Sequence, residues 1–212
     1  MARSALFDCQ LYGILDLGYT EAEALVDTAK LMVDGGIDIV QLRAKGCEPD
    51  DIERWATSLQ PVFSEAGVPF VINDYPEIAA RVGTDAVHVG QDDLEMDAVR
   101  EIVGDEMLVG RSTHSLEQAA KAASDPRTDC IGFGPLFSTP TKPDYVPIGI
   151  DDIRAVHEAH PDLPIFCIGG IKKENLHRVV EAGARRAVIV SGILQAPDMI
   201  SYIREAKSIL AG

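Results

Sequence analysis

Short apolar runs alternate along this chain with longer segments in which apolar residues recur every three or four positions. The runs cover residues 11–17, 37–42, 68–72, 86–89, 107–109, 130–133, 164–168 and 187–190. Helical spacing covers residues 21–34, 50–66, 76–82, 96–103, 116–124, 151–160, 174–182 and 199–210. Because the short runs are apolar on both faces, they are typical of parallel strands covered by helices. The pattern therefore predicts eight strand–helix units.

Eight such units in 212 residues favour a compact (β/α)8 barrel, with a doubly wound open sheet as the second choice. Glycines directly after several helical segments, such as Gly36, Gly67 and Gly83, fit helix C-termini. We find no linker and no low-complexity segment. The expectation is a single barrel domain over residues 1–212.

Charge and cysteine usage narrow the class of protein. The net charge of -15 argues against nucleic acid or an anionic membrane as partner, so any anion site must be a local exception or must use a metal ion. The four cysteines lack metal-ligand spacing, and Cys130 and Cys167 lie in apolar runs, which predicts buried thiols in a reducing compartment. No signal-peptide or membrane-spanning run is present, so we expect a cytoplasmic protein.

Polar residues follow seven consecutive strands, at the strand ends where a barrel builds its active site. From the second strand onward they are Gln41, Arg43 and Lys45; Asn73 and Asp74; Asp93; Ser112 and His114; Thr139, Thr141 and Lys142; Gly169 and Gly170; Ser191 and Gly192. Any one of these groups alone has a structural explanation, such as a turn or a helix cap. Their co-location favours function.

Three kinds of chemistry follow from these residues. Arg43, Lys45 and Lys142 are cations placed to converge on an anion. Asp74 and Asp93 suit Mg²⁺, which takes one or two carboxylates together with substrate phosphate oxygens. The backbone N–H groups after strands seven and eight suit a second phosphate. The sequence therefore predicts one diphosphate and one monophosphate substrate.

Three histidines need separate interpretation. His88 lies in an apolar run and is typical of a hydrogen-bonded core histidine, whereas His157 lies on a helix pattern and is expected at the surface. His114 follows the fifth strand, and two roles stay open for it: a general acid or base, or a group that orients Ser112.

Seven segments, in this order and spacing, resemble the thiamine-phosphate synthase family over about residues 12–193. They are Gln41-Leu42-Arg43-x-Lys45, Ile72-Asn73-Asp74, Val87-His88-Val89-Gly90-Gln91-x-Asp93, Ser112-x-His114, Gly134-Pro135-x-Phe137-x-Thr139-x-Thr141-Lys142, Ile168-Gly169-Gly170-Ile171 and Val190-Ser191. The resemblance implies a barrel transferase that joins hydroxymethylpyrimidine diphosphate to thiazole phosphate and releases pyrophosphate.

The resemblance also implies a role for each matching residue. Asp74 and Asp93 would hold Mg²⁺, and the diphosphate would be bound by Arg43, Lys45, Asn73 and Lys142. Gln41 would lie by the pyrimidine and Ser112 near the reacting methylene. The thiazole phosphate would contact Thr139 and Thr141, and its phosphate group would be bound by Gly170, Val190 and Ser191. Ser112, Lys142 and Arg43 are the expected catalytic groups. Loss of the diphosphate followed by attack of the thiazole nitrogen needs no protein nucleophile, in keeping with the absence of a convincing catalytic triad.

The chain departs from the family pattern at Ala44, Tyr75, Gly192 and the Asp16-Leu17-Gly18 ending of strand one, where the family usually has Glu, Arg, Ala and Thr-Asp.

Two alternative functions stay open. A thiazole tautomerase relative would use His114 as its proton carrier, but it has no use for the diphosphate residues as a set. Another phosphate-binding barrel, such as an epimerase or a non-catalytic binder, leaves the two carboxylates unexplained. The sequence does not fix the number of subunits, and a homo-oligomer stays open.

Overall fold

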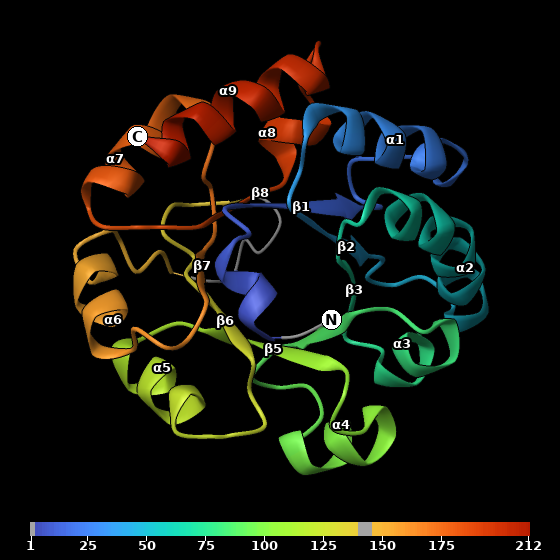
Figure 1. Cartoon of the computed structure of the whole chain (residues 1–212), viewed down its shortest axis with the longest axis horizontal. Helices are drawn as coiled ribbons and strands as arrows, with labels where there is room; N and C mark the ends of the chain where they lie inside the picture. Colours follow the sequence, from blue (N-terminus) through green and yellow to red (C-terminus); the bar gives the residue numbers. More distant parts are fainter. Residues whose placement is uncertain (1–2, 140–145) are drawn as a thin grey trace.

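A computed structural model describes residues 3–139 and 146–212 of the chain. Eight parallel strands close into a barrel in sequence order, and helices surround it (Figure 1). The strands are β1 (Leu11–Asp16), β2 (Ile39–Arg43), β3 (Phe70–Asn73), β4 (Ala86–Val89), β5 (Leu108–Thr113), β6 (Cys130–Phe133), β7 (Ile165–Cys167) and β8 (Ala187–Ile189). The predicted (β/α)8 barrel is confirmed.

The helices follow the strands in the expected alternation. They are α1 (Leu25–Gly35), α2 (Pro49–Ala66), α3 (Pro76–Val82), α4 (Met96–Val103), α5 (Leu116–Ala123), α6 (Ile153–Ala159), α7 (Lys173–Glu181), α8 (Ser191–Leu194) and α9 (Met199–Ala211), with 3-10 helices η1 (Arg3–Phe7) and η2 (Ala22–Ala24). The sequence pattern missed η1 and α8, which are too short to show a period, and it predicted one helix over residues 21–34 where η2 and α1 follow each other. No helix in the described ranges has the length and apolarity needed to cross a membrane.

Two apolar layers result from the period-2 alternation of the strands. Leu11 and Leu15 of β1 face the helices, whereas Tyr12 and Ile14 face the barrel interior with residues such as Phe166. Tyr12 and Phe166 meet edge to face with ring centroids 5.2 Å apart. Because both faces of each strand are buried, the strands appear as continuous apolar runs in the sequence.

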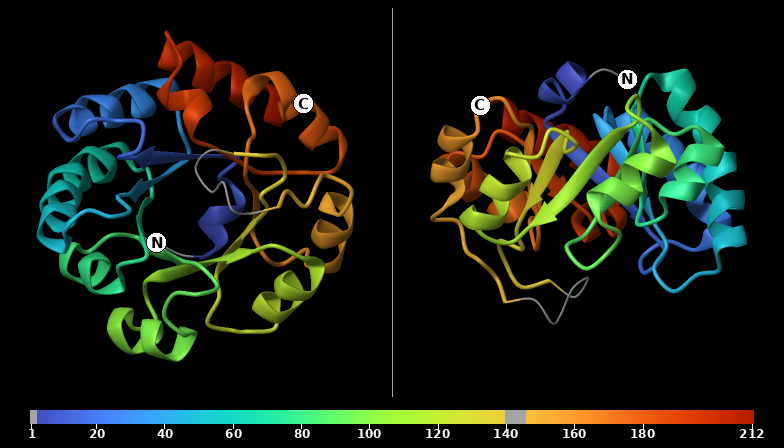
Figure 2. Two further views of the ribbon diagram at one scale, coloured as in Figure 1. Left: turned by 180° about the vertical axis from the view of Figure 1, so that it is seen from behind. Right: turned by 90° about the horizontal axis from the view of Figure 1, so that it is seen from below.

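The two mouths of the barrel differ. Helix η1 lies across the amino-terminal mouth, in the centre of Figure 1, and its Leu6 is buried in the interior cluster. Figure 2 (right) shows η1 on the face opposite to residues 134–139 and 146–152, the described parts of the connection that follows β6. Closure of one mouth leaves the carboxyl ends of the strands as the face where a ligand can enter.

An aspartate directly before each of three even-numbered strands ties adjacent strands together. Asp38, Asp85 and Asp129 precede β2, β4 and β6, and each accepts a hydrogen bond from a backbone N–H at the start of the preceding strand. The donors are Leu11, Phe70 and Val109, at 2.9, 3.0 and 2.8 Å. The same position before β8 is Arg186, which donates to the carbonyl of Phe7 in η1 at 2.8 Å.

Two expectations need correction. The apolar pattern ends the fifth strand at residue 109, but β5 runs to Thr113, because Arg111 and Thr113 still pair with Ile131 and Phe133 of β6. Their polar side chains obscure the strand in the sequence.

The helix pattern places His157 at the surface, but it is buried on α6 and its Nδ1 lies 2.9 Å from the Ile153 carbonyl oxygen. The thiols of Cys130 and Cys167 are buried as predicted.

Candidate active site

A pocket opens at the carboxyl ends of the strands and extends into the barrel interior. Eight of the residues predicted from the sequence line it: Gln41, Arg43, Asn73, Ser112, Thr139, Gly170, Val190 and Ser191. Three more, Lys45, Asp74 and Asp93, adjoin it through contacts described below. Thr141 and Lys142 lie outside the described residues.

A chain of hydrogen bonds fixes the amide side chains on one wall of the pocket. The Tyr12 hydroxyl donates to Gln41 Oε1 at 3.0 Å, Gln41 Nε2 donates to Asn73 Oδ1 at 3.2 Å, and Asn73 Nδ2 donates to Asp74 Oδ2 at 2.6 Å. Gln41 is buried, so its amide has little freedom to turn. Each partner therefore determines which way the next amide faces.

Asp74 and Asp93 come together although 19 positions separate them in the chain. Burial foremost, and then the hydrogen-bonded carboxyl of Asp93, raise the pKa of Asp74, against the opposing effect of the ion-paired Lys45. Asp74 has a φ of 66°, an uncommon conformation for a non-glycine residue. Asp93 accepts a hydrogen bond from the Gly90 N–H at 2.6 Å. Two close carboxyls resist joint ionisation unless a cation lies between them.

Each of the two described cations at this end of the pocket already has a carboxylate partner. Arg43 Nη1 donates to Asp16 Oδ2 at 2.7 Å, and Lys45 pairs with Asp74. Burial opposes the charge of Lys45, but the hydrogen bond and charge of Asp74 outweigh it and raise the pKa of the amine. The Asp16 side chain is only 3% exposed and also accepts from the Gly18 N–H at 2.9 Å. No site role for Asp16 follows from the sequence.

Ser112 is positioned deeper in the pocket. Its Oγ lies 3.0 Å from His88 Nε2, and its carbonyl accepts a hydrogen bond from Gln91 Nε2 at 2.5 Å. His88 is hydrogen-bonded as predicted, but it lines the pocket instead of lying in the core between strands and helices. A Cβ at Gly110 would lie 2.6 Å from His88 Nδ1, so the glycine leaves room for this ring.

His114 also lines the pocket. Its Nδ1 lies 2.5 Å from the Gly134 carbonyl oxygen, and its backbone N–H donates to Gln118 Oε1 at 2.8 Å. A carbonyl accepts only, so Nδ1 carries the hydrogen in this contact. Orientation of Ser112 is one of the two roles that the sequence leaves open for His114. In the structure it is the ring of His88 that lies within hydrogen-bonding distance of Ser112 Oγ.

The opposite wall of the pocket is formed by the backbone of two connections, one from β7 to α7 and one from β8 to α8. Gly169 and Gly170 have φ values of 97° and 65°, and a Cβ at Gly170 would lie 2.7 Å from both Phe137 Cβ and the Ser138 carbonyl oxygen. Asn175 Nδ2 donates to the Gly170 carbonyl at 3.0 Å and thereby holds this loop. The glycine pair thus permits both the turn and a close approach to the segment after β6.

The structure also explains the departure at Gly192. A Cβ at this position would lie 2.4 Å from Tyr202 Oη and 3.0 Å from Ile189 Cγ2. Alanine cannot be accommodated there while Tyr202 keeps its place. At Ala44 and Tyr75 nothing in the structure explains the departures.

A pocket lined by glycine backbone and flanked by cations and a close carboxylate pair lies at the carboxyl ends of a closed parallel barrel, where enzymes of the (β/α)8 class carry their active sites. A model of the thiamine monophosphate synthase family matches residues 11–193. The chain belongs to this family of transferases, which act on small molecules.

Individual relatives agree with this assignment. The thiamine-phosphate synthase of Acidothermus cellulolyticus is 40% identical over 99% of this chain and 98% of its own length. That of Thermus thermophilus is 40% identical over 90% of this chain and 91% of its own. A solved thiamine phosphate pyrophosphorylase from Pyrococcus furiosus superposes with a TM-score of 0.86 at 26% identity, covering 99% of this chain and 97% of that one.

Proposed function

We propose that this chain joins hydroxymethylpyrimidine diphosphate to thiazole phosphate, with Mg²⁺ bound by Asp74 and Asp93, and releases pyrophosphate. The C–O bond to the diphosphate breaks, and the leaving group keeps the electron pair. The thiazole nitrogen then forms the new C–N bond to the methylene carbon. The observation that carries the proposal is that Lys45, Asn73 and the two carboxyls cluster beside one pocket whose far wall is glycine backbone.

The leaving-group side depends on more than the two described cations. Arg43 and Lys45 bind the diphosphate, but Asp16 and Asp74 already balance their charges. Mg²⁺ fits here because two carboxyls, the partly buried Asp74 and the exposed Asp93, lie close together, and hard carboxylate oxygens are its preferred protein ligands. When bound there, Mg²⁺ would supply positive charge that stabilises the departing diphosphate. By resemblance, Lys142 adds a further cation.

Gln41 suits recognition of the pyrimidine. Its Oε1 accepts from Tyr12 and its Nε2 donates to Asn73, so the amide orientation is fixed. One N–H and one lone pair remain for a ligand. An aminopyrimidine edge offers the complementary acceptor and donor side by side. Ser112, held by His88, lies beside the reacting methylene.

The second substrate binds on the backbone wall. Thr139 lines the pocket between the two walls, and by resemblance it contacts the thiazole phosphate together with Thr141. Gly170, Val190 and Ser191 bind the phosphate group of this substrate, largely through backbone N–H groups. Binding in this arrangement brings the thiazole nitrogen to the methylene, and positioning of the two reactants supplies much of the catalysis.

The test is pyrophosphate release from the two substrates, with Mg²⁺ and after EDTA treatment, with thiamine phosphate identified as product. We expect metal-dependent release and a loss on the order of 10²-fold or more in Asp74→Asn, Arg43→Ala and Lys142→Ala, since each removes charge from the leaving-group site. Arg54→Ala is the matched control because Arg54 is an exposed cation on α2.

Undiminished release in EDTA, or by Asp74→Asn, would refute the metal site. A folded protein that binds thiazole phosphate yet releases no pyrophosphate would instead favour the tautomerase alternative, in which His114→Ala abolishes proton transfer.

A further inference from the structure

Tyr202 on α9 lies outside the pocket, yet its hydroxyl accepts a hydrogen bond from the segment that follows β7 and occupies the space where a side chain would stand on the segment that follows β8. The Lys173 N–H donates to Tyr202 Oη at 2.6 Å. The same oxygen lies 2.4 Å from where a Cβ would stand on Gly192. Lys173 follows the Gly169–Gly170 loop, and Gly192 follows the pocket residue Ser191. One hydroxyl thus connects the segment after β7 with the segment after β8.

Glycine is needed at position 192 because Tyr202 approaches closely, and not because the backbone there is left-handed. Gly192 is absent from the residues with positive φ, so alanine could adopt its backbone conformation. The obstacle is Tyr202, whose Oη and Cζ lie 2.4 and 3.1 Å from the added carbon. Either the ring or the Ser191–Gly192 backbone has to move when that carbon is present.

The tyrosine itself is held firmly. Lys173 Nζ lies 5.3 Å from the centre of the Tyr202 ring and pairs with Glu205 Oε2 on the same helix at 2.5 Å. Tyr202 is half-buried, and burial foremost raises the pKa of its hydroxyl, which therefore stays protonated at neutral pH. With the ring fixed, an added carbon on Gly192 displaces the β8–α8 backbone.

We propose that Tyr202 is a positioning residue for the monophosphate site, and that Gly192 is the small residue that its hydroxyl requires. The hydroxyl sets the spacing between the β7–α7 and β8–α8 backbones, so that their N–H groups converge on one phosphate group. This inference rests on the proposed function only in assigning the thiazole phosphate to that wall. A displacement of about 1 Å in a positioning group can cost on the order of 10²-fold in rate, so small shifts of this backbone have large effects.

The experiment is a double-mutant cycle of Gly192→Ala and Tyr202→Phe. Calorimetry measures the Kd of thiazole phosphate, and steady-state kinetics measure the KM of each substrate. We expect Gly192→Ala to raise the Kd and KM of thiazole phosphate by about tenfold or more, with the KM of the diphosphate substrate unchanged. Tyr202→Phe, which loses the hydrogen bond to Lys173, should raise the Kd several-fold.

The double variant is the decisive member of the cycle. Removal of the hydroxyl relieves the 2.4 Å contact, so Gly192→Ala/Tyr202→Phe should bind thiazole phosphate more tightly than Gly192→Ala alone. Ser208→Ala, which changes an exposed side chain of α9, is the matched control and should leave both KM values unchanged. If Gly192→Ala does not fold, Tyr202→Phe and the double variant still test the selective loss of phosphate affinity.

Equal affinity of Gly192→Ala and the wild type would overturn the proposal. So would a double variant that binds as weakly as Gly192→Ala, or equal rises in both KM values, because a role in stability alone predicts no selectivity between substrates. Because the Kd is measured without turnover, a wild-type protein that releases no pyrophosphate but shows the expected Kd pattern would refute the proposed function and leave this inference standing.

Discussion

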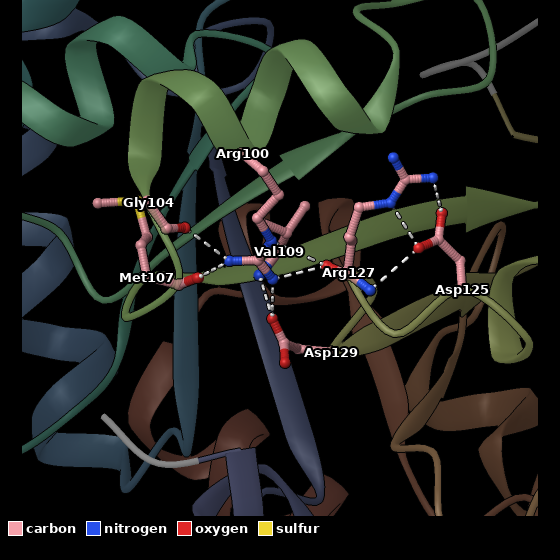
Figure 3. Close-up of polar contacts among 7 residues, drawn as sticks. All are labelled: Arg100, Gly104, Met107, Val109, Asp125, Arg127 and Asp129. Carbon is pink, nitrogen blue, oxygen red and sulfur yellow. Dashed lines mark hydrogen bonds and ion pairs between the residues drawn. The ribbon is translucent and has the colours of Figure 1, made fainter.

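Arg100 on α4 joins separate segments of the chain outside the pocket lining, and its removal should lower the free energy of unfolding. Its guanidinium donates to the carbonyls of Gly104, Met107 and Arg127 and to Asp129 Oδ2, in five hydrogen bonds of 2.6–3.2 Å (Figure 3). The side chain is only 13% exposed. It therefore fastens the end of α4, the turn before β5 and the turn before β6 to one another.

Arg100→Met keeps the apolar stem and removes every one of these donors. Three carbonyls lose these donors, and the 14%-exposed carboxylate of Asp129 loses its ion-pair partner while it keeps the hydrogen bond from the Val109 N–H. Breaking a buried ion pair from one side costs about 3–5 kcal/mol. Water can reach part of this network, so we take about 3 kcal/mol, the lower end of that range. For a chain of this size, each kcal/mol lowers Tm by about 2–4 °C, which gives a fall of about 6–12 °C.

The assay is thermal unfolding and urea unfolding of the wild type, Arg100→Met, Asp129→Asn and the double variant. The double variant should lose less free energy of unfolding than the sum of the single variants, because each single change leaves the other group without its partner. Activity at low temperature should be unchanged, since the network lies at the amino ends of β5 and β6, opposite to the strand ends where the pocket opens. A fall in Tm below about 2 °C for Arg100→Met, or strict additivity, would show that the reasoning is wrong.

Two further predictions concern the site and the pH dependence. Asp16→Asn should raise the KM of the diphosphate substrate by about tenfold, because Arg43 loses a charged hydrogen bond worth about 1.5–3 kcal/mol that orients it. Steady-state kinetics test this prediction, with Asp162→Asn as the exposed control. A KM equal to that of the control would contradict it. Burial foremost lowers the pKa of His157 from its ordinary 6.5, so the unfolded chain binds the proton more readily and the free energy of unfolding falls as pH drops below about 6.5. His157→Gln should flatten this fall in urea titrations between about pH 7 and pH 5, and an unchanged slope would exclude His157 as its cause.

The alternation of strands and helices could be predicted from the sequence because its causes are local. Strands buried on both faces are apolar throughout, and amphipathic helices repeat every three to four residues. For the same reason the strand ends, and with them the residues of the candidate site, could be located from the order of residues alone. The prediction failed where a strand carries polar residues, as at Arg111 and Thr113 of β5, because the ladder hydrogen bonds that define a strand leave no trace in side-chain type.

The sequence by itself determined the fold class, the family and eight of the residues that line the pocket, since these follow from local pattern and motif order. The tertiary structure decided which of those side chains meet. The pairing of Arg43 with Asp16, the closeness of Asp74 to Asp93 and the hydrogen bond from the Lys173 N–H to Tyr202 join residues from different strand–helix units. Such contacts depend on barrel closure, which sets distances between residues far apart in the chain and which no local pattern encodes.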